Sequence, residues 1–155
     1  MGINVIVGNS RIDGKGVFAA RDFRRGETVL RWDTSQIISE DRLNALMPEQ
    51  RRFLSYIGGG RYVLLQEPEK YVNHSCDSNT IANNCSDIAV KDIRACEEIT
   101  ADYSLEGLKD LEMRCNCGII NCRSIIYGDF ERLDPDTKEK LMPFLQDWYK
   151  QEIFG

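Results

Sequence analysis

Histidine and long apolar runs are scarce in this 155-residue sequence. His74 is its one histidine, and nowhere do 18 apolar residues follow one another. The first residues, MGINVIVGNSRI, also lack a basic stretch followed by an apolar core. These absences argue against a membrane span and against a secretory signal peptide. We therefore expect a soluble, intracellular protein.

An excess of positive charge is absent as well. Twenty basic residues stand against 25 acidic ones, which gives a net charge of −5. This balance disfavours general nucleic-acid binding and favours a positively charged partner, for which a basic peptide is the natural candidate. We expect no membrane partner, and the composition does not indicate an oligomeric state.

The cysteines that are present fall into three single residues and one cluster. They are Cys76, Cys85 and Cys96, followed by Cys115, Cys117 and Cys122. In a chain without a secretion signal, tight clustering favours metal ligation over a disulfide framework. Tetrahedral structural zinc takes four soft ligands, so three clustered thiolates predict a fourth ligand from elsewhere in the chain. Each of the three single cysteines is a candidate for it.

The length and an apolar content of 42% suit one compact domain with a single core. The first third of the chain contains the short runs NVIVG, GKGVFAA and GETVLRW, which alternate apolar and polar residues and are broken by glycine. This pattern is typical of short twisted strands joined by tight turns. The sequence therefore predicts a mostly β fold with short helices.

Three helical segments are predicted. The first begins at the cap Ser39 and ends before Pro48. The second begins at Pro48, has an apolar stripe over residues 53–57 and ends at the glycines 58–60. The third is the C-terminal segment LDPDTKEKLMPFLQDWYKQEIFG, with Asp134 as cap and Pro135 at its first position. Pro143 must kink or split it, and its stripe of Leu141, Leu145 and Trp148 is expected to dock on the core.

An internal echo relates two segments of the chain. ARDFRRGETV (residues 20–29) and VKDIRACEEI (residues 90–99) match position by position in residue type. We interpret them as two similar strand-turn-strand corners, which is too little for a repeat protein. Cys96 stands where Gly26 stands in the first copy.

Four short motifs occur in one order. GKGVF lies near the start, NHSC spans residues 73–76, EEITADY ends at Tyr103, and RCNCGIINCRS follows. In this order they resemble the SET-domain protein-lysine methyltransferases, whose pattern is G-x-G-x-[AG], N-H-S-C-x-P-N, G-E-E-[IL]-[TF]-[YF]-D-Y and a post-SET C-x-C-G-x3-C-R-G. The resemblance covers residues 10–126. It implies a β-clip-like fold of several small sheets with a knot-like C-terminal crossing.

The resemblance also implies how the chain is divided. Residues 1–110 correspond to the SET domain and residues 111–126 to the post-SET zinc-binding segment. Residues 127–155 are expected to form a C-terminal helical tail that packs on the domain. No cysteine-rich segment precedes the domain, so we expect a minimal, single-domain form.

A binding site for S-adenosylmethionine follows from the same resemblance. The matching positions are Lys15, Gly16, Val17 and Phe18 at the methionine and ribose end, with Asn73, His74, Tyr103 and Asn116 around the rest of the cofactor. The resemblance selects Cys76 as the remote ligand of one structural zinc ion, beside Cys115, Cys117 and Cys122. Four thiolates leave no open position for a water molecule, so this zinc is not expected to be catalytic.

The implied reaction is transfer of methyl groups to a lysine side chain. A lysine ammonium has a pKa of about 10.4, so it is almost fully protonated at neutral pH. A narrow apolar tunnel opposite a cationic sulfonium lowers that pKa by desolvation and by like-charge repulsion, and the proton is expected to leave to water. In-line displacement at the methyl carbon then depends on positioning, with the Tyr103 hydroxyl at the transfer point.

The walls of the lysine channel are less well defined by the sequence. The substrate-channel candidates are Trp32, Tyr71 and Ala101, with Tyr56, Tyr62, Phe130, Phe144 and Trp148 as further aromatic candidates for its walls and mouth. Ala101 stands where the family usually has Phe or Tyr, and we hypothesise that the space it leaves tolerates di- or trimethyllysine. Ser78, Cys96 and Ser124 replace turn residues of the family pattern.

Two other functions are considered. The first is a catalytically silent SET-like zinc module that binds a peptide partner, and the second is a cysteine hydrolase that uses His74 with a thiol. The sequence does not identify the methylated lysine. A histone is one candidate substrate, in which case the protein would act in the nucleus or in a host cell rather than in its own cytoplasm.

Overall fold

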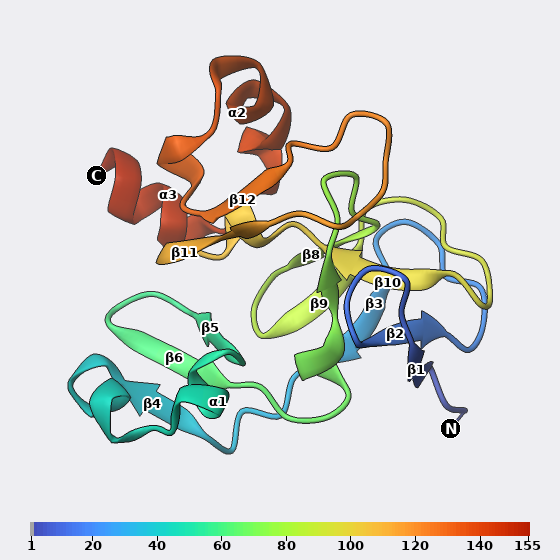
Figure 1. Cartoon of the computed structure of the whole chain (residues 1–155), viewed down its shortest axis with the longest axis horizontal. Helices are drawn as coiled ribbons and strands as arrows, with labels where there is room; N and C mark the ends of the chain where they lie inside the picture. The colour runs from blue at the N-terminus through green and yellow to red at the C-terminus, as the bar shows by residue number, and fades with distance from the viewer. Residues whose placement is uncertain (1) are drawn as a thin grey trace.

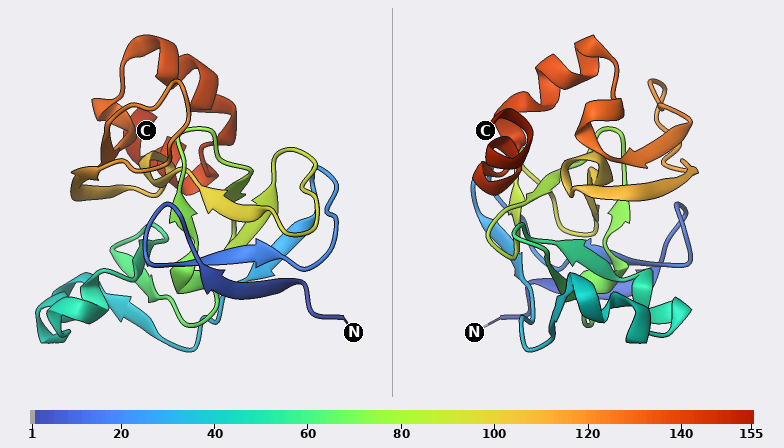
Figure 2. Two further views of the ribbon diagram at one scale, coloured as in Figure 1. Left: turned by 45° about the vertical axis from the view of Figure 1, so that its right-hand side comes forward. Right: turned by 90° about the vertical axis from the view of Figure 1, so that its left-hand side faces the viewer.

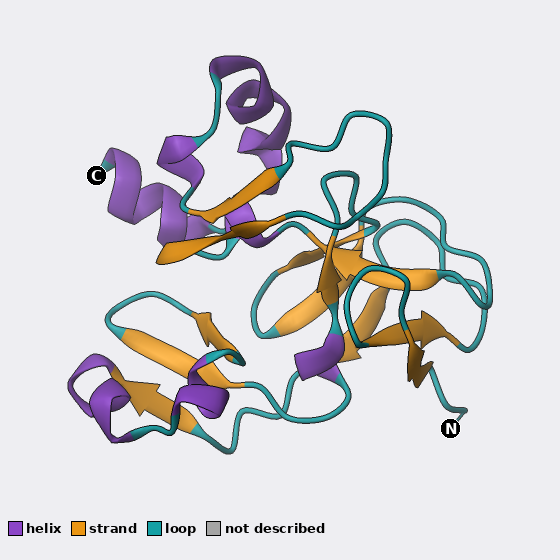
Figure 3. Ribbon diagram, viewed as in Figure 1, coloured by secondary structure: helices purple, strands orange, loops and turns teal. Residues whose placement is uncertain are grey.

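The computed structural model describes residues 2–155 and is mostly β, with short helices between the strands (Figure 3). The strands are β1 (Val5–Asn9), β2 (Lys15–Ala19), β3 (Thr28–Arg31), β4 (Ile37–Ser39), β5 (Leu54–Tyr56), β6 (Arg61–Leu64), β7 (Asn73–His74), β8 (Thr80–Ala82), β9 (Ser86–Ala89), β10 (Glu98–Ala101), β11 (Leu108–Arg114) and β12 (Ile125–Gly128). The α-helices are α1 (Pro48–Arg51), α2 (Pro135–Leu141) and α3 (Asp147–Phe154). Short 3-10 helices span Glu40–Ala45, Glu69–Tyr71, Tyr103–Leu105, Phe130–Arg132 and Met142–Phe144.

The strands form four small sheets, as the sequence predicts. Their orders are β1-β2-β10-β7, β3-β9-β8, β4-β6-β5 and β11-β12. The N-terminal strands and β10 lie together in Figure 1, and the β11-β12 hairpin lies between the β4-β6-β5 sheet and α2 in Figures 1 and 2. The short strand β7 pairs in parallel with β10, with Asn73 opposite Thr100 and His74 opposite Ala101. This pairing brings the NHSC and EEITADY motifs together.

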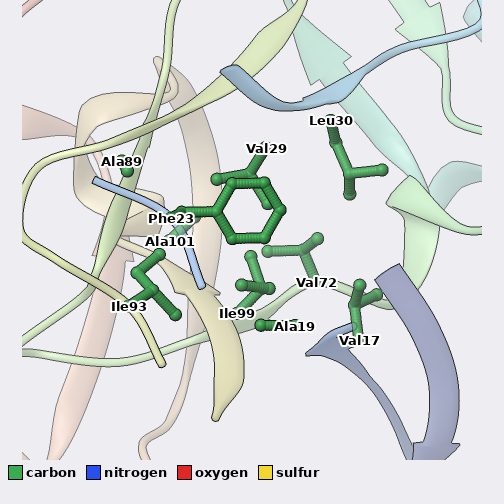
Figure 4. Close-up of a cluster of buried hydrophobic side chains, with 10 residues drawn as sticks. All are labelled: Val17, Ala19, Phe23, Val29, Leu30, Val72, Ala89, Ile93, Ile99 and Ala101. Atoms are coloured by element: carbon green, nitrogen blue, oxygen red, sulfur yellow. The ribbon is translucent and has the colours of Figure 1, made fainter. Parts of the chain in front are cut away.

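One apolar core contains side chains from the GKGVF motif on β2 and from the EEITADY motif on β10. Phe23 lies at its centre, 1% exposed, against side chains from β2, β3 and β10 (Figure 4). Val17 and Ile99, paired across β2 and β10, have no exposed surface. Burial of this kind stabilises a fold by about 1.5–3 kcal/mol for each large side chain. The core therefore fixes the strands that carry the glycine motif and the tyrosine motif.

The internal echo is a pair of corners that bind each other reciprocally. Phe23 and Ile93 exchange two backbone hydrogen bonds of 2.7 and 2.8 Å. The Arg25 N–H donates to the Asp92 carboxylate, and the Ala95 N–H donates to the Asp22 carboxylate. Matching positions thus make matching contacts, which confirms the interpretation of the two segments as similar corners.

Two glycine replacements in the family pattern occur at strained backbone positions. Cys96 has φ 73° and Ser124 has φ 67°, while Gly26, at the position equivalent to Cys96, has φ 92°. Non-glycine residues are uncommon in this region because the Cβ atom crowds the backbone. The turn geometry has therefore been kept although the glycine has been replaced.

The second predicted helix is wrong over most of its length. Helix α1 covers only Pro48–Arg51, and residues 54–56 form strand β5 in antiparallel pairing with β6. The apolar spacing from Phe53 to Ile57 fits a short strand as well as a helix, and pairing with β6 decides between them. The first predicted segment is a 3-10 helix, and Ser39 makes no capping hydrogen bond with its side chain. No helix within residues 2–155 is long and apolar enough to cross a membrane.

The C-terminal tail forms α2 and α3 around a second apolar cluster. Asp134 caps α2 through a hydrogen bond from the Thr137 N–H, and Pro143 separates α2 from α3, as predicted. Leu145 is 4% exposed and Tyr149, which the sequence analysis did not single out, is 1% exposed. The Tyr149 hydroxyl accepts a hydrogen bond from the Phe130 N–H at 3.0 Å. This tail packs on the β domain through its own cluster.

Candidate functional site

A cavity of about 700 Å³ opens where β7, β10 and the loop before β2 meet. Ile12, Asp13, Gly14 and Lys15 line it, together with Asn73, His74 and Asn116. Trp32, Tyr62, Tyr71, Ala101 and Tyr103 also line it. Residues from all four sequence motifs therefore line one cavity.

Asn73 holds the loop before β2 in place. Its side-chain amide donates to the carbonyl oxygens of Asp13 and Lys15 at 3.1 and 3.0 Å, and to the Glu98 carboxylate at 3.1 Å. Ser10 donates to the same carboxylate oxygen at 2.7 Å. The loop that borders the cavity is thus fixed from both of its ends.

The glycine motif lies partly behind the cavity rather than at its surface. Lys15 lines the cavity, but Gly16, Val17 and Phe18 do not. Val17 points into the core, and a Cβ atom on Gly16 would overlap the Glu98 carboxylate. Residues 12–15 face the cavity and β2 supports them, and contact of Gly16, Val17 and Phe18 with the cofactor, expected largely through backbone groups, stays a prediction.

His74 is buried and neutral. Burial lowers its pKa to about 4, although the nearby Asp102 carboxylate opposes this shift. Its Nδ1 accepts a hydrogen bond from the Tyr103 N–H at 3.0 Å, so Nε2 must carry the ring proton. Nε2 lies 3.4 Å from the Cys76 Sγ and donates to it. His74 therefore joins the backbone of Tyr103 to the cysteine cluster.

Tyr103 lines the cavity and is held there by its hydroxyl and its ring. Its hydroxyl donates to the Val72 carbonyl oxygen at 2.6 Å, and its ring lies edge-on to the His74 ring. Burial raises the pKa of this phenol, and the charge of Glu106 raises it further. The hydroxyl is therefore a fixed, neutral dipole and cannot act as a phenolate base near neutral pH.

Cys76 joins the three clustered cysteines. The Sγ atoms of Cys76, Cys115, Cys117 and Cys122 all lie within 4.8 Å of one another, and those of Cys76 and Cys115 are 3.7 Å apart. Zn–S bonds of about 2.3 Å in a tetrahedron put neighbouring sulfur atoms about 3.8 Å apart. Cys85 and Cys96 lie outside this group. The four sulfur atoms are thus arranged so that they could hold one metal ion.

Arg123 ties the cysteine loop to the tyrosine motif. Its guanidinium group forms an ion pair of 2.6 Å with Asp102 and donates to Ser104 Oγ at 3.2 Å. Its backbone N–H points at the Cys76 Sγ at 3.4 Å. Since Asp102 directly precedes Tyr103, the position of the tyrosine depends on the closed loop.

The geometry excludes a cysteine hydrolase built on His74. The Nδ1 atom accepts from the Tyr103 N–H and carries no proton, so Asp102, 3.8 Å away, cannot accept a hydrogen bond from an Nδ1–H as the third group of a triad would. Burial raises the pKa of the Cys76 thiol, which is the reverse of activation. Cys76 also lies outside the large cavity.

The aromatic candidates divide into two groups. Trp32, Tyr62 and Tyr71 line the cavity with Ala101, which is 2% exposed. Phe130, Phe144 and Trp148 belong to the C-terminal cluster instead, and Tyr56 packs on Trp148 with ring centroids 5.1 Å apart. The proposal that tail residues close the channel mouth is wrong, because these rings are used to dock the tail.

Three of the acidic residues that line the cavity are buried or half-buried, and the sequence analysis did not single them out. Glu69 and Asp87 are each 3% exposed, and Glu106 is half-buried. Burial raises the pKa of Asp87 to about 7 and that of Glu106 to about 8, and each shift is increased by a neighbouring carboxylate. The sequence gives no sign that they are buried, since no motif surrounds them and acidic residues are mostly exposed.

This chain matches one protein-family model and is similar to several known proteins. A protein-family model described as "SET domain" matches residues 14–104. "Histone-lysine N-methyltransferase 2D" of Homo sapiens is 30% identical over 136 residues, which is 77% of this chain and 2% of that protein. "Histone-lysine N-methyltransferase, H3 lysine-4 specific" of Saccharomyces cerevisiae is 37% identical over 67 residues, which is 37% of this chain and 6% of that protein.

Two similar solved structures are of Polycomb Repressive Complex 2. One, a humanized mutant of the Chaetomium thermophilum complex, has a TM-score of 0.53 and 30% identity and covers 66% of this chain and 15% of that chain. The other, described as "ctPRC2 in an autoinhibited conformation bound to S-adenosylmethionine", has a TM-score of 0.52, 27% identity and the same coverage. This chain spans a small share of each of these proteins.

Proposed function

The chain belongs to the SET domain family, and on that premise we propose that it is an S-adenosylmethionine-dependent protein-lysine N-methyltransferase. One observation carries the proposal: a single cavity is bordered by the loop of residues 12–15, by Asn73 and His74, and by Tyr103 with its aromatic neighbours. A methyl donor and an aliphatic amine must meet in one water-poor space for this chemistry. The cavity brings the candidate residues for both together.

The residues around one part of the cavity fit S-adenosylmethionine. Gly14 has φ 42° and a Cβ atom there would meet nothing within 4 Å, so the backbone of this loop is open to a ligand. Asn73 and His74 supply polar groups beside it, and Asn116 comes from the cysteine loop. The solved relative with S-adenosylmethionine bound supports the same ligand. When bound, this cofactor supplies an electrophilic methyl group on a sulfonium.

The four cysteines fit one structural zinc ion. Their sulfur atoms match the spacing of a tetrahedral thiolate site, and the N–H groups of His74 and Arg123 point at the Cys76 sulfur. Four protein ligands leave no place for a reactive water. The role of the metal is to hold residues 115–124 against β7, which keeps Asn116 at the cavity.

The remaining side chains position the amine. Trp32 and Tyr71 form apolar walls for a lysine stem, and the Tyr103 hydroxyl, fixed by its bond to Val72, presents its oxygen to the methyl group. Oxygen atoms of this kind attract the hydrogens of a methyl group that carries positive charge. Orientation and exclusion of water therefore account for most of the rate enhancement expected here.

The substrate class is a lysine of a protein. Relatives named histone-lysine N-methyltransferases support a histone or another basic protein as partner, and the net charge of −5 favours a basic one. We place the protein inside cells, with its compartment set by that substrate.

A methylation assay tests this function. Purified protein loaded with zinc is mixed with S-adenosylmethionine and a panel of basic lysine peptides, and products are weighed by mass spectrometry. We expect mass increases of whole methyl groups on lysine peptides, none on matched arginine peptides, and loss of at least about 10²-fold in rate for Tyr103→Phe. If correctly folded, zinc-loaded protein binds these peptides but adds no methyl group, the chain is a silent binding module instead.

A further inference from the structure

Three of the five acidic residues that line the cavity are buried or half-buried and have no protein counter-charge. Glu69, Asp87 and Glu106 come from three different segments of the chain. None of them forms an ion pair within residues 2–155. The basic side chains that also line the cavity are Lys15, Arg51, Arg52, Lys70, Lys109 and Arg114, and none of these six comes within ion-pair distance of the three carboxylates. Without a counter-charge, burial raises the pKa of Asp87 and of Glu106, and a cation that enters the cavity would favour their ionised forms.

Asp87 has an oxygen left over for a ligand. It is 3% exposed, and its Oδ2 accepts the Trp32 indole N–H at 2.7 Å. Within the described chain no hydrogen bond reaches its other oxygen, although the residue lines the cavity. Glu69 is held in a similar way, because its Oε1 accepts the Asp33 N–H at 2.8 Å. Both carboxylates are therefore fixed by one oxygen only.

Glu106 is the least constrained of the three. It follows the 3-10 helix that begins at Tyr103, and its carboxylate receives no hydrogen bond from residues 2–155. The negative charges that act on it come from Asp87 and Asp102. Its own charge in turn acts on the Tyr103 phenol. Glu106 is thus close to the proposed transfer point and free to bind a group that enters the cavity.

A metal ion does not explain these carboxylates. The cysteine cluster is the one group in the described part of the chain whose ligand atoms lie close enough together to share an ion. The three carboxylates are spread along an aromatic cavity that includes Trp32, Tyr71 and Tyr103. Carboxylates combined with aromatic faces suit an organic cation such as an alkylammonium group.

We propose that Glu106 binds the ε-ammonium group of the target lysine, with Asp87 and Glu69 beside it, and accepts one of its protons before methyl transfer. This proposal rests on the function proposed above and replaces the expectation that the proton leaves directly to water. The N–H bond breaks with its electron pair left on nitrogen, and an O–H bond forms on the carboxylate. The ammonium and carboxylate become a neutral amine and a neutral acid, so charge and atoms balance.

The chemistry of the cavity favours this proton transfer. A lysine and a glutamate in water differ in pKa by about six units, which makes the neutral pair very unfavourable. With the pKa of Glu106 at about 8, the difference narrows to about two units. Burial of both groups favours the neutral pair further, because desolvation penalises charges. The proton can leave Glu106 for solvent when the methylated product departs.

Peptide binding measured by calorimetry tests the first half of the proposal. The zinc-loaded protein with S-adenosylhomocysteine is titrated with a lysine peptide and with the same peptide carrying norleucine, in two buffers of different ionisation enthalpy. We expect the wild type to prefer lysine by about tenfold or more and to release protons near pH 7, since the ammonium ionises Glu106. Glu106→Gln should lose both effects, and Glu49→Gln, an exposed change outside the cavity, should keep them.

The pH dependence of turnover tests the second half. Removing a general base costs on the order of 10²-fold or more in kcat, so Glu106→Gln should turn over slowly near pH 7 and recover as pH rises. Asp87→Asn keeps an oxygen for Trp32 and should show a smaller loss. If Glu106→Gln matches Glu49→Gln in lysine preference and in pH profile while the wild type methylates peptides, the proposal is overturned and the methyltransferase function stands. A wild type that transfers no methyl group overturns the function itself.

Discussion

Cys96 is the residue at which local backbone strain is most directly testable. Its φ of 73° lies where L side chains are crowded, and Gly26 occupies the equivalent position in the first corner. We expect Cys96→Gly to raise the free energy of unfolding by about 0.5–1 kcal/mol, because relief of strain exceeds the added entropy of the unfolded chain.

Gly26→Ala is the matched control for that change. A Cβ atom at Gly26 would meet nothing within 4 Å, so only the backbone at φ 92° is affected. It should lower the free energy of unfolding by about 1 kcal/mol. Urea unfolding of both variants measures these effects. A Cys96→Gly variant less stable than the wild type would show that the thiol contributes more than the strain costs.

Ala101 offers a second test at the residue scale. It lines the cavity beside Tyr103 and leaves a space that a larger side chain would fill. We expect wild-type protein to form di- and trimethyllysine, and Ala101→Tyr to shift the product toward monomethyllysine by at least about tenfold. Mass spectrometry of the product over time gives this ratio. A wild type restricted to monomethyllysine, with no change in the variant, would contradict the hypothesis.

Single residues also mark the limit of what the sequence can predict. Cys76, Asn73 and His74 were located by a motif. Cys76 lies with the three clustered cysteines, and Asn73 and His74 line the cavity. Asp87 and Glu106 have no such context, and their importance comes from burial by segments distant in the chain. The resemblance implies a backbone contact of Val17 with the cofactor, and the Val17 side chain packs in the core.

At the scale of elements, the cysteine loop is the part of the fold that depends most on a ligand. Residues 115–124 contain three of the four thiolates and meet the rest of the chain through Cys76 and through the Arg123–Asp102 ion pair. Without metal, four close thiols have little to hold them together, and metal binding becomes part of the stability of the loop.

Removal of zinc should therefore loosen the loop and the tyrosine motif together. We expect one bound zinc per chain by metal analysis, and after chelation faster amide exchange in residues 115–126 and at Tyr103. Cys76→Ser should bind at least about tenfold less metal, and Cys85→Ser, whose thiol lies outside the cluster, should bind as the wild type does. Unchanged exchange after chelation would mean that the loop is closed by the Arg123 contacts alone.

The elements also show why some predictions failed. Residues 134–154 carry a cap, a proline and a regular stripe, and these local signals gave the correct helices. Residues 53–57 have an apolar run too short to distinguish a helix from a strand, and their pairing with β6 is set by the fold around them. Local patterns predict a helix well because its backbone hydrogen bonds form within the same segment. They predict a strand less well because its hydrogen-bond partners lie elsewhere in the chain.

At the scale of the whole molecule, Asp87 should make stability depend on pH. Burial raises its pKa to about 7, so between about pH 4 and pH 7 the folded protein holds a proton that the unfolded chain has released. The free energy of unfolding must fall as pH rises through this range, by an amount on the order of 4 kcal/mol from this residue. This decrease in the free energy of unfolding ends once the pH exceeds the pKa of Asp87 in the folded protein.

Asp87→Asn isolates that contribution. The amide oxygen can still accept the Trp32 N–H, and the group no longer titrates. Urea unfolding of both proteins at several pH values should give curves that diverge above about pH 5, with the variant more stable near pH 8. Metal affinity also changes with pH, so the difference between the two proteins is the quantity to compare. Curves that stay parallel would show that Asp87 ionises in the folded protein without lowering the free energy of unfolding.

The overall architecture was the most predictable level. Four ordered motifs implied several small sheets, and the internal echo anticipated the reciprocal corners around Phe23 and Ile93. The path of the tail was not predictable, since its aromatic residues could equally have faced the cavity or their own cluster. That choice depends on shape complementarity across the whole chain.

Binding of S-adenosylmethionine tests the central claim most directly, because every proposed role refers to the cavity bordered by residues 12–15, Asn73, His74 and Tyr103. Calorimetric titration of zinc-loaded protein should give one site per chain, weakened at least about tenfold by Asn73→Ala, which releases the loop before β2. Exposed Glu49→Gln should bind as the wild type does. A folded, zinc-loaded wild type that binds no S-adenosylmethionine would contradict the account.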